Sequence, residues 1–368
     1  MNSKLCFRLA VPDDDSAIRQ LLREAEMNGA LALTYDYEQS FFSALEIQGS
    51  EPVVMVTERN GNIIAVGVIS RRQVYFNGLP LEIGYLSHLR ISQAHRKSLI
   101  LARGYQFLRK LHNTEFNVPF YLSSIMADNA AAIVLTEERV GFPVYQLLAT
   151  YHTLLLPIFR SGKRSVATSG ISITRGTIEV IPTLLDFLHR EGSQKQFFPV
   201  VSRAELEGET GPLKGIGIDN FFIARDDAGQ IIGALAIWDQ SRQKNIVIRS
   251  YHGRMGIVKK LSDCICKTDL LPDPENPIKV KLASCIVIMN NCRKVFRALL
   301  DAAMYELKKK ATGYLAIGID SQDPLLREIT TPWHLTLKSN IFQVYWPDPE
   351  KPLPEPDGRI NYFELGML

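Results

Sequence analysis

The sequence has little that would tie the protein to the cell exterior, a membrane or a polyanion. It has five cysteines in 368 residues, an odd number without the spacing of a disulfide framework. It also lacks an apolar run long enough to span a bilayer and the apolar segment of a signal peptide. The formal net charge of +3 gives no global attraction to nucleic acid. We therefore expect a cytoplasmic protein, with neither nucleic acid nor a membrane as a partner.

Metal-binding patterns are equally scarce. Cys264 and Cys266 are closer together than the cysteines of most structural zinc sites, even with His252 upstream, so we expect no metal. Cys285 lies in an apolar run, which predicts a buried thiol. Cys292 follows two asparagines at a predicted helix start, where a thiol pKa can fall. A chemical role for Cys292 is a lesser alternative to a structural one.

What the chain has is enough apolar material for two cores. Hydrophobic residues make up 46% of the sequence and charged residues 22%, and the length exceeds that of an ordinary single domain. A polar stretch rich in small residues, without periodicity, runs from Arg160 to Gly170. These features predict an N-terminal domain at 1–160, a linker at 161–170 and a C-terminal domain at 171–368.

The two halves have similar element orders. The first predicts strands near 6–10, 52–58, 63–70, 81–91, 119–125 and 143–156, with helices after 15, 100 and 129. The second predicts strands near 171–175, 221–225, 231–237, 280–288, 314–320 and 335–346, with an inserted polar region at 250–277. The turn glycines Gly61 and Gly229 are each followed, two residues later, by a pair of isoleucines. This similarity favours an internal duplication over two unrelated hairpins.

The stretch from Leu81 to His112 joins an apolar strand to a helix through a basic turn. The turn contains Arg96, Lys97 and Ser98, and a helical apolar stripe begins at Leu101. Free backbone N–H groups at a helix start, helped by cations, can bind a phosphate. The alternative is an ordinary solvated helix start.

This pattern resembles the GNAT acyl-CoA N-acyltransferase fold. The features that carry the resemblance are the opening strand with Arg8, the hairpin with Gly61, the strand and basic turn up to Leu101, and the segment from Asn129 to Phe142. The resemblance implies an α/β fold with mixed sheets, as two tandem GNAT-like domains of which the second is degenerate. It extends over nearly all of the first half and more faintly over the second.

The resemblance also implies the residues of an acyl-CoA site. The pantetheine contacts would be Leu89, Arg90 and Ile91, the pyrophosphate turn would be Arg96, Lys97, Ser98, Leu99, Ile100 and Leu101, and Asn129 would contact the cofactor from the neighbouring strand end. Leu99 and Leu101 stand where the family usually has small residues, which narrows the space for a phosphate. The basic pair at 96–97 supplies charge in compensation.

Candidate catalytic groups lie on the strand before the turn. Tyr85 and Ser87 have the phase of the substrate-facing position, whereas Glu82 and His88 have the opposite parity unless a bulge shifts the register. Tyr85, Ser87 and Glu82 are the candidates for proton transfer, and a structural role is the alternative for each.

Together these features predict an N-acyltransferase. An acetyl group, or another acyl group, would pass from acetyl-CoA or another acyl-CoA to the amine of a small molecule or peptide by direct attack, without a metal. The alternative is a non-catalytic acyl-CoA-binding or protein-interaction module, which the two leucines of the turn favour.

Overall fold

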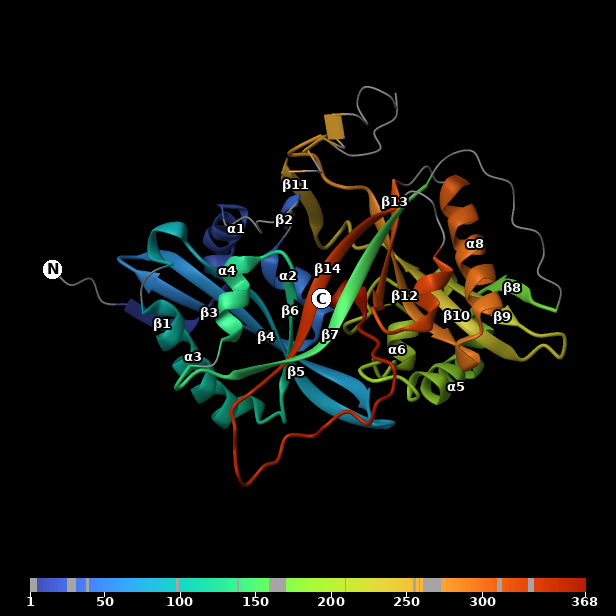
Figure 1. The fold of residues 1–368 in the computed structure, drawn as a ribbon, viewed down its shortest axis with the longest axis horizontal. Helices are drawn as coiled ribbons and strands as arrows, with labels where there is room; N and C mark the ends of the chain where they lie inside the picture. Colours follow the sequence, from blue (N-terminus) through green and yellow to red (C-terminus); the bar gives the residue numbers. More distant parts are fainter. Residues whose placement is uncertain are drawn as a thin grey trace.

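The computed structural model describes residues 5–24, 31–37, 40–96, 99–137, 139–158, 170–208, 210–253, 256–257, 259–260, 273–309, 313–329 and 334–368. Its centre is one mixed sheet of 12 strands, flanked by helices (Figure 1). From one edge to the other, the strands are β1 (Leu5–Leu9), β3 (Ser50–Arg59), β4 (Asn62–Phe76), β5 (Leu79–Ile91), β6 (Tyr121–Met126), β14 (Leu335–Tyr345), β7 (Val144–Pro157), β13 (Tyr314–Asp320), β12 (Val280–Ile288), β10 (Ile231–Trp238), β9 (Phe221–Arg225) and β8 (Ser172–Arg175).

The strands follow the same order of antiparallel and parallel pairs from either edge of the sheet toward its centre. From β1, three antiparallel pairs lead to β5, which is parallel to β6. From β8, three antiparallel pairs lead to β12, which is parallel to β13. The next strand in each direction comes from the other half of the chain, because β14 pairs with β6 and β7 pairs with β13. The two halves therefore share one sheet through β14 and β7, which lie side by side in the middle (Figure 1).

This sheet contains the predicted strands but leaves the predicted domain boundary untested. The predicted strands and the main helices are present, and Gly61 and Gly229 both have φ +79, which explains why each tight turn uses glycine. Of the predicted linker at 161–170, only Gly170 lies within the described residues. The domain boundary therefore stays a prediction, and the strand order adds that the halves do not have separate sheets.

Helices cover both faces of the sheet in the first half. The apolar stripes of α1 (Asp15–Glu24) and α2 (Phe41–Leu45) pack on Val54 and Val56, whereas α3 (Ile100–Leu111) packs on the face that carries Val53 and Met55. Since successive strand residues point to opposite faces, these helices lie on opposite sides of β3. The short α4 (Ala130–Ile133) follows β6.

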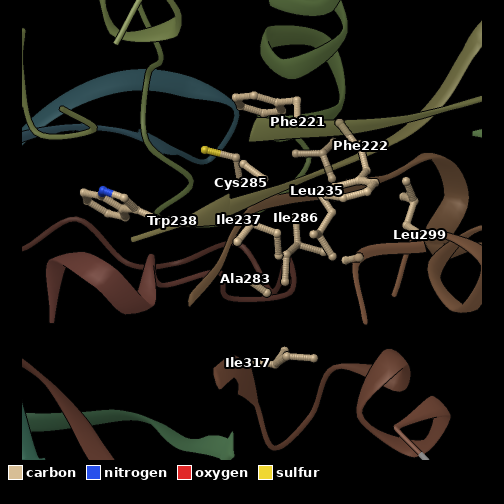
Figure 2. Close-up of a cluster of buried hydrophobic side chains, with 14 of the residues drawn as sticks. Phe221, Phe222, Leu235, Ile237, Trp238, Ala283, Cys285, Ile286, Leu299 and Ile317 are labelled. Carbon is tan, nitrogen blue, oxygen red and sulfur yellow. The ribbon is translucent and has the colours of Figure 1, made fainter. Parts of the chain in front are cut away.

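The second half has the larger core. The helices α5 (Ile181–Gly192) and α8 (Arg293–Lys309) pack on β9, β10 and β12, and α6 (Arg203–Leu206) lies beside α5. Figure 2 shows part of this cluster, in which Phe222 and Leu235, paired across β9 and β10, lie on the side of Leu299 in α8. None of the described helices is long and apolar enough to cross a membrane.

A separate two-stranded ribbon links the halves on one face of the sheet. It consists of β2 (Leu31–Asp36) and β11 (Asn245–Tyr251), which pair antiparallel although they lie about two hundred residues apart. Leu33 and Ile248 form a small core with Leu335 and Leu337 of β14. The sequence did not predict this ribbon, because neither strand continues the repeat.

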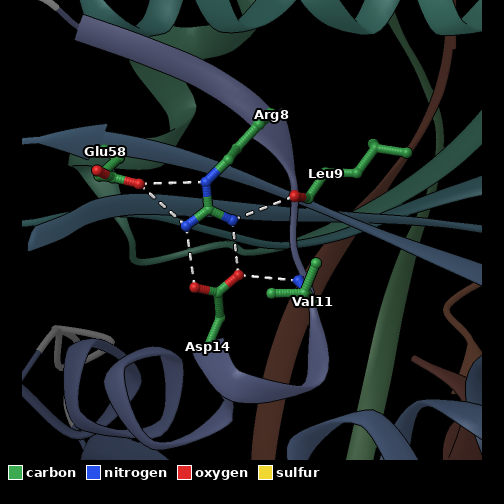
Figure 3. Close-up of polar contacts among 5 residues, drawn as sticks. All are labelled: Arg8, Leu9, Val11, Asp14 and Glu58. Carbon is green, nitrogen blue, oxygen red and sulfur yellow. Dashed lines mark hydrogen bonds and ion pairs between the residues drawn. The ribbon is translucent and has the colours of Figure 1, made fainter. Parts of the chain in front are cut away.

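An ion-pair network fixes the first strand. Arg8 makes a bidentate contact with Asp14, at 2.7 and 3.0 Å, and donates to Glu58 at 3.0 and 3.1 Å (Figure 3). The Arg8 guanidinium lowers the pKa of Asp14, which also accepts a hydrogen bond from the Val11 amide at 2.8 Å. Arg8 thus joins β1, β3 and the start of α1, and its role is structural.

Candidate functional site

The two parallel strands β5 and β6 separate after three paired residues. Their pairing runs from Gly84–Tyr121 to Leu86–Ser123, and β5 then continues to Ile91 with β4 as its only ladder partner among the described strands. Gly84 lies at the closed end of this opening. A Cβ atom there would lie 2.0 Å from the Tyr121 ring, so only glycine allows the two strands to approach in this way.

A cavity of about 350 Å³ occupies the opening and reaches both faces of the sheet. On the side of α3 its wall includes Leu86, Leu101 and Tyr105. On the other side its wall extends under the β2–β11 ribbon and over the central strands, with lining residues Leu33, Tyr35, His88, Arg90, Lys244, Ile246, Ile248, Leu335 and Leu337. A cavity that passes through a splayed sheet can bring two substrates together from opposite faces.

A β-bulge shapes the wall of this cavity. Val66 pairs with Arg90 and Val68 pairs with Ser87, so two residues of β5 oppose one residue of β4. His88, the first of the two, has φ +53, an uncommon conformation for a residue other than glycine. The bulge breaks the alternation of side chains, and the neighbouring Ser87 and His88 therefore contact each other directly.

The bulge begins a chain of hydrogen bonds. Ser87 Oγ donates to Gln48 Oε1 at 2.9 Å, so it must accept the 2.9 Å hydrogen bond from Nδ1–H of His88. His88 Nε2 is then unprotonated and accepts from the Tyr37 hydroxyl at 2.5 Å. Burial raises the pKa of Tyr37 well above its ordinary value, which keeps this hydroxyl a donor. The ring of Phe41 meets His88 edge-on at 5.3 Å and holds its orientation.

The electrostatics of the site are those of a partly buried cationic wall. Burial, with the charges of Arg90 and Lys244, lowers the pKa of His88 to about 3, so the imidazole is neutral at physiological pH. Burial and the charge of Arg72 lower the pKa of Lys244 to about 8. Neither Arg90 nor Lys244 forms an ion pair within the described chain, and none of the described lining residues is an aspartate or glutamate.

The residues predicted for acyl-CoA binding fall into three groups. Six line the cavity, namely Leu89, Arg90, Ile91, Ile100, Leu101 and Asn129. Arg96 and Leu99 are exposed and are not among the residues that line the cavity; Leu99 is 66% exposed, so its side chain does not fill the opening. Lys97 and Ser98 lie outside the described residues.

Of the three residues predicted for proton transfer, two line the cavity. Tyr85 is 2% exposed, its pKa is raised by burial to about 12, and the Arg72 guanidinium lies 3.5 Å from its ring centre. Ser87 belongs to the hydrogen-bond chain described above. Glu82 is not at the cavity, because it pairs with Arg71 at 2.7 Å near the start of β5.

Sequence reasoning did not assign a role to His88, Tyr37, Gln48 or Lys244. The signal for His88 was its position beside Ser87, but without the bulge its parity placed it on the other face. Tyr37 and Gln48 come from segments with no family pattern, and Lys244 comes from the second half. Only the folded chain brings them together.

The second half contains the counterpart of the bulge, but its surroundings differ. Ala234 pairs with Val287 and Ala236 with Ser284, so Cys285 is equivalent to His88, and its φ is +49. The C-terminal segment covers this bulge. The Cys285 amide donates to Glu364 Oε2 at 2.9 Å, and the Ile286 amide donates to the Tyr362 hydroxyl at 3.1 Å.

The described cysteines are Cys6, Cys285 and Cys292, and all three are free thiols. Cys285 is buried, as predicted, and Cys292 is exposed, whereas Cys264 and Cys266 lie outside the described residues. Within the part of the chain that the structure describes, no three His, Cys, Asp or Glu side chains are arranged to hold a metal ion.

Comparison with known proteins finds similarity in fold alone. No protein-family model matches the sequence, and no curated protein is similar to it in sequence. Among solved structures, the GCN5-related glucosamine N-acetyltransferase region of a fungal multi-domain GH3 β-N-acetylglucosaminidase matches with a TM-score of 0.63 and 12% identity over 94% of this chain. The present chain covers 38% of that protein's length.

Two further structures match most of both chains. A GCN5-related N-acetyltransferase from Sphaerobacter thermophilus has a TM-score of 0.60 and 10% identity, over 92% of this chain and 95% of its own. The N-myristoyltransferase of Saccharomyces cerevisiae, solved with bound myristoyl-CoA, has a TM-score of 0.57 and 11% identity, over 96% of this chain and 83% of its own. The predicted mixed α/β fold is thereby confirmed, and the chain has the GNAT fold over most of its length, whereas the two-domain tandem form stays a prediction.

Proposed function

We propose that the protein is an N-acyltransferase that moves an acyl group from acyl-CoA to an amine. The observation that carries the proposal is the cavity at the splayed strands β5 and β6, which is open to both faces of the sheet and bordered by a β-bulge. The structurally similar proteins include N-acetyltransferases and an N-myristoyltransferase that binds myristoyl-CoA. Their activities support acyl transfer in general and leave the acyl group and the acceptor open.

Acyl-CoA would enter from the face covered by α3. The start of α3 carries the positive end of the helix dipole. No acidic residue lies in the first turn, so the helix dipole and Arg96 favour a phosphate there. The pantetheine arm would then follow Leu89–Ile91 into the opening, and Asn129 would border it from the end of β6.

The bulge would bind the thioester carbonyl. Its amides are those of His88 and Leu89, and among the described residues no side chain accepts a hydrogen bond from either. Their counterparts in the second half, at Cys285 and Ile286, donate to the oxygen atoms of Glu364 and Tyr362. Because these counterparts bind a carboxylate oxygen and a hydroxyl oxygen, the equivalent amides of His88 and Leu89 are suited to stabilise the oxyanion of a tetrahedral intermediate.

The acceptor amine would attack from the opposite face. Its nitrogen forms the new N–C bond, the C–S bond then breaks, and CoA leaves as a thiolate that takes up the proton lost by that nitrogen. Ser87 Oγ has one lone pair that the hydrogen-bond chain does not use, and it can orient an N–H bond of the attacking amine. Because His88 Nε2 is occupied by Tyr37, the chain orients Ser87 rather than removing a proton, and the amine must bind in its neutral form.

The same comparison supports acyl-CoA binding in the first half alone. In the second half the bulge amides are already satisfied, and the segment that satisfies them is buried, with Glu364 only 4% exposed. A ligand there would have to displace Glu364 and Tyr362.

Two measurements test the proposal on the purified full chain. Titration calorimetry with CoA measures binding, and release of free thiol from acetyl-CoA and longer acyl-CoAs, with a panel of amines, measures transfer. Thiol release that depends on both acyl-CoA and an amine supports the proposal. CoA binding without amine-dependent release would support the non-catalytic alternative, and the absence of both would refute an acyl-CoA site.

A further inference from the structure

The second half has a counterpart of the opening between β5 and β6, and a segment of the chain itself lies in it. The parallel pairing of β12 with β13 ends at Ala283–Ile317, after four residue pairs. The C-terminal segment, residues 361–367, contacts both strands beyond this point. Asn361 Nδ2 donates to Asp320 Oδ2 at the end of β13 at 2.8 Å, and the carboxylate of Glu364 reaches the bulge of β12. The segment therefore lies where the strands of the second half separate.

Glu364 is the anchor of this segment. Its carboxylate accepts a hydrogen bond from the Cys285 amide at 2.9 Å and caps the short 3₁₀ helix Leu365–Met367 that follows. Gly366 in this helix lies so close to Trp238 of β10 that a Cβ atom would be 2.3 Å from the indole ring. These contacts fix the short helix against the second half.

Arg72 of β4 connects this short helix to the first half. The Arg72 side chain is buried, its Nη2 donates to the Met367 carbonyl, and its Nε donates to the Gln48 carbonyl at 2.6 Å. The Gln48 carbonyl also accepts a hydrogen bond from the Ser70 hydroxyl at 3.3 Å. Because one planar guanidinium holds both carbonyls, a displacement of Met367 must move Gln48 or break a buried hydrogen bond.

Gln48 in turn sets the direction of the Ser87 hydroxyl. Gln48 Oε1 accepts from Ser87 Oγ at 2.9 Å, which leaves the lone pairs of Ser87 for His88 and for the attacking amine. If Gln48 moves away, the Ser87 hydroxyl is free to rotate and to donate to Nδ1 of His88, and the imidazole then changes its tautomer. The direction of one O–H bond at the reaction site thus depends on contacts made through Arg72.

We propose that the bulge of the second half is a positioning site for the reaction in the first half, with Glu364 as its anchor and Arg72 as its connection to Ser87. The inference rests on the proposed acyl transfer and adds a role for the second half, whose own bulge amides are already occupied. Glu364 and Arg72 act through other residues, so both are positioning residues.

The first test separates turnover from cofactor binding in the full chain. With acetyl-CoA and the most active amine of the panel, Arg72→Met should lower kcat by about tenfold to a hundredfold, the effect of misplacing a reacting group by about 1 Å. CoA affinity, measured by calorimetry, should stay within about twofold. Arg72→Lys keeps a donor and should recover part of the loss.

The second half offers a matched pair of variants at buried glutamates. Glu364→Gln weakens the anchor and should lower kcat by about threefold, because one hydrogen bond is lost while the segment stays in place. Glu328→Gln is the control, since Glu328 is also buried but pairs with Arg293 and Arg297 of α8. It should leave kcat unchanged, and an equal loss in both variants would overturn the inference.

A double mutant determines whether Arg72 acts through Ser87. In a Ser87→Ala background the hydroxyl is absent, so adding Arg72→Met should lower the residual kcat by no more than about twofold. Equal losses in the wild-type and Ser87→Ala backgrounds would show that Arg72 affects the reaction by another route, and would overturn the inference.

A further readout needs no turnover. The ¹⁵N NMR signals of labelled histidine rings distinguish the two imidazole tautomers, and His88→Gln identifies the signals of His88 among the seven histidines. We expect Nδ1 of His88 to be protonated in the wild type. In Arg72→Met, and to a smaller extent in Glu364→Gln, the signals should shift toward the other tautomer, whereas Glu328→Gln should leave them in place.

The outcomes separate this inference from the proposed function. A shift of the His88 signals in Arg72→Met, without amine-dependent thiol release, supports the positioning and refutes acyl transfer. Transfer with kcat and the His88 signals unchanged in Arg72→Met and Glu364→Gln overturns the positioning and leaves acyl transfer standing. Should Arg72→Met fail to fold, Glu364→Gln against Glu328→Gln decides by the same two readouts.

Discussion

Removal of the Glu364 side chain should destabilise the protein more than most single substitutions. Glu364 is 4% exposed and accepts hydrogen bonds from the Cys285 amide at 2.9 Å and from the Tyr362 hydroxyl at 2.7 Å. The Glu364→Ala change leaves both donors buried without a partner. Each unsatisfied donor costs about 1–3 kcal/mol, so the free energy of unfolding should fall by about 2–6 kcal/mol.

The matched variant is Glu364→Gln, which keeps the size of the side chain and one acceptor oxygen. We expect it to cost about 1–2 kcal/mol, because one hydrogen bond weakens while the cavity stays filled. The comparison isolates the two donors from simple loss of volume. Urea unfolding, followed by tryptophan fluorescence and circular dichroism, measures both differences.

The pH dependence of the free energy of unfolding tests the protonation of Glu364. Burial raises the pKa of Glu364 above its ordinary value, so the folded protein binds this proton more tightly than the unfolded chain. Its contribution to stability is therefore complete below the ordinary glutamate pKa and is lost as pH rises through the raised pKa. The stability gap between wild type and Glu364→Gln should be largest in acid and narrow as pH rises. Equal losses in the two variants, or a gap that widens with pH, would refute this account of the C-terminal segment.

Three shorter predictions concern the cavity. Tyr85→Phe should leave turnover within about threefold, since the ring keeps its contact with Arg72, and a larger loss of kcat would assign the hydroxyl to the reaction. Since the pKa of His88 is depressed to about 3, its contribution to stability is lost as pH falls below about 6.5, and in urea unfolding His88→Gln should remove part of that acid sensitivity. Arg96→Gln should weaken CoA binding by about 1 kcal/mol in calorimetry, whereas Arg293→Gln, whose arginine pairs with Glu328, should not; equal losses would contradict binding in the first half alone.

Much of the architecture could be predicted from local patterns. The strand before Ile91, the helix from Ile100 and the equivalent hairpins at Gly61 and Gly229 follow from apolar periodicity and turn residues, which depend on neighbours in the chain. For the same reason the residues along the opening, such as Leu89 and Asn129, could be proposed from their positions in that pattern.

Tertiary structure alone determined how the halves combine and what surrounds the reaction site. β7 and β14 each pair with a strand of the other half, and β2 pairs with β11. These pairings depend on hydrogen bonds between segments far apart in the chain, which no local period encodes. The bulge at His88 is one extra residue opposite Gly67, and it reverses the side-chain parity on which the sequence prediction relied. Lys244 reaches the cavity from the second half because the ribbon carries it there, so its charge became part of the site only when the chain folded.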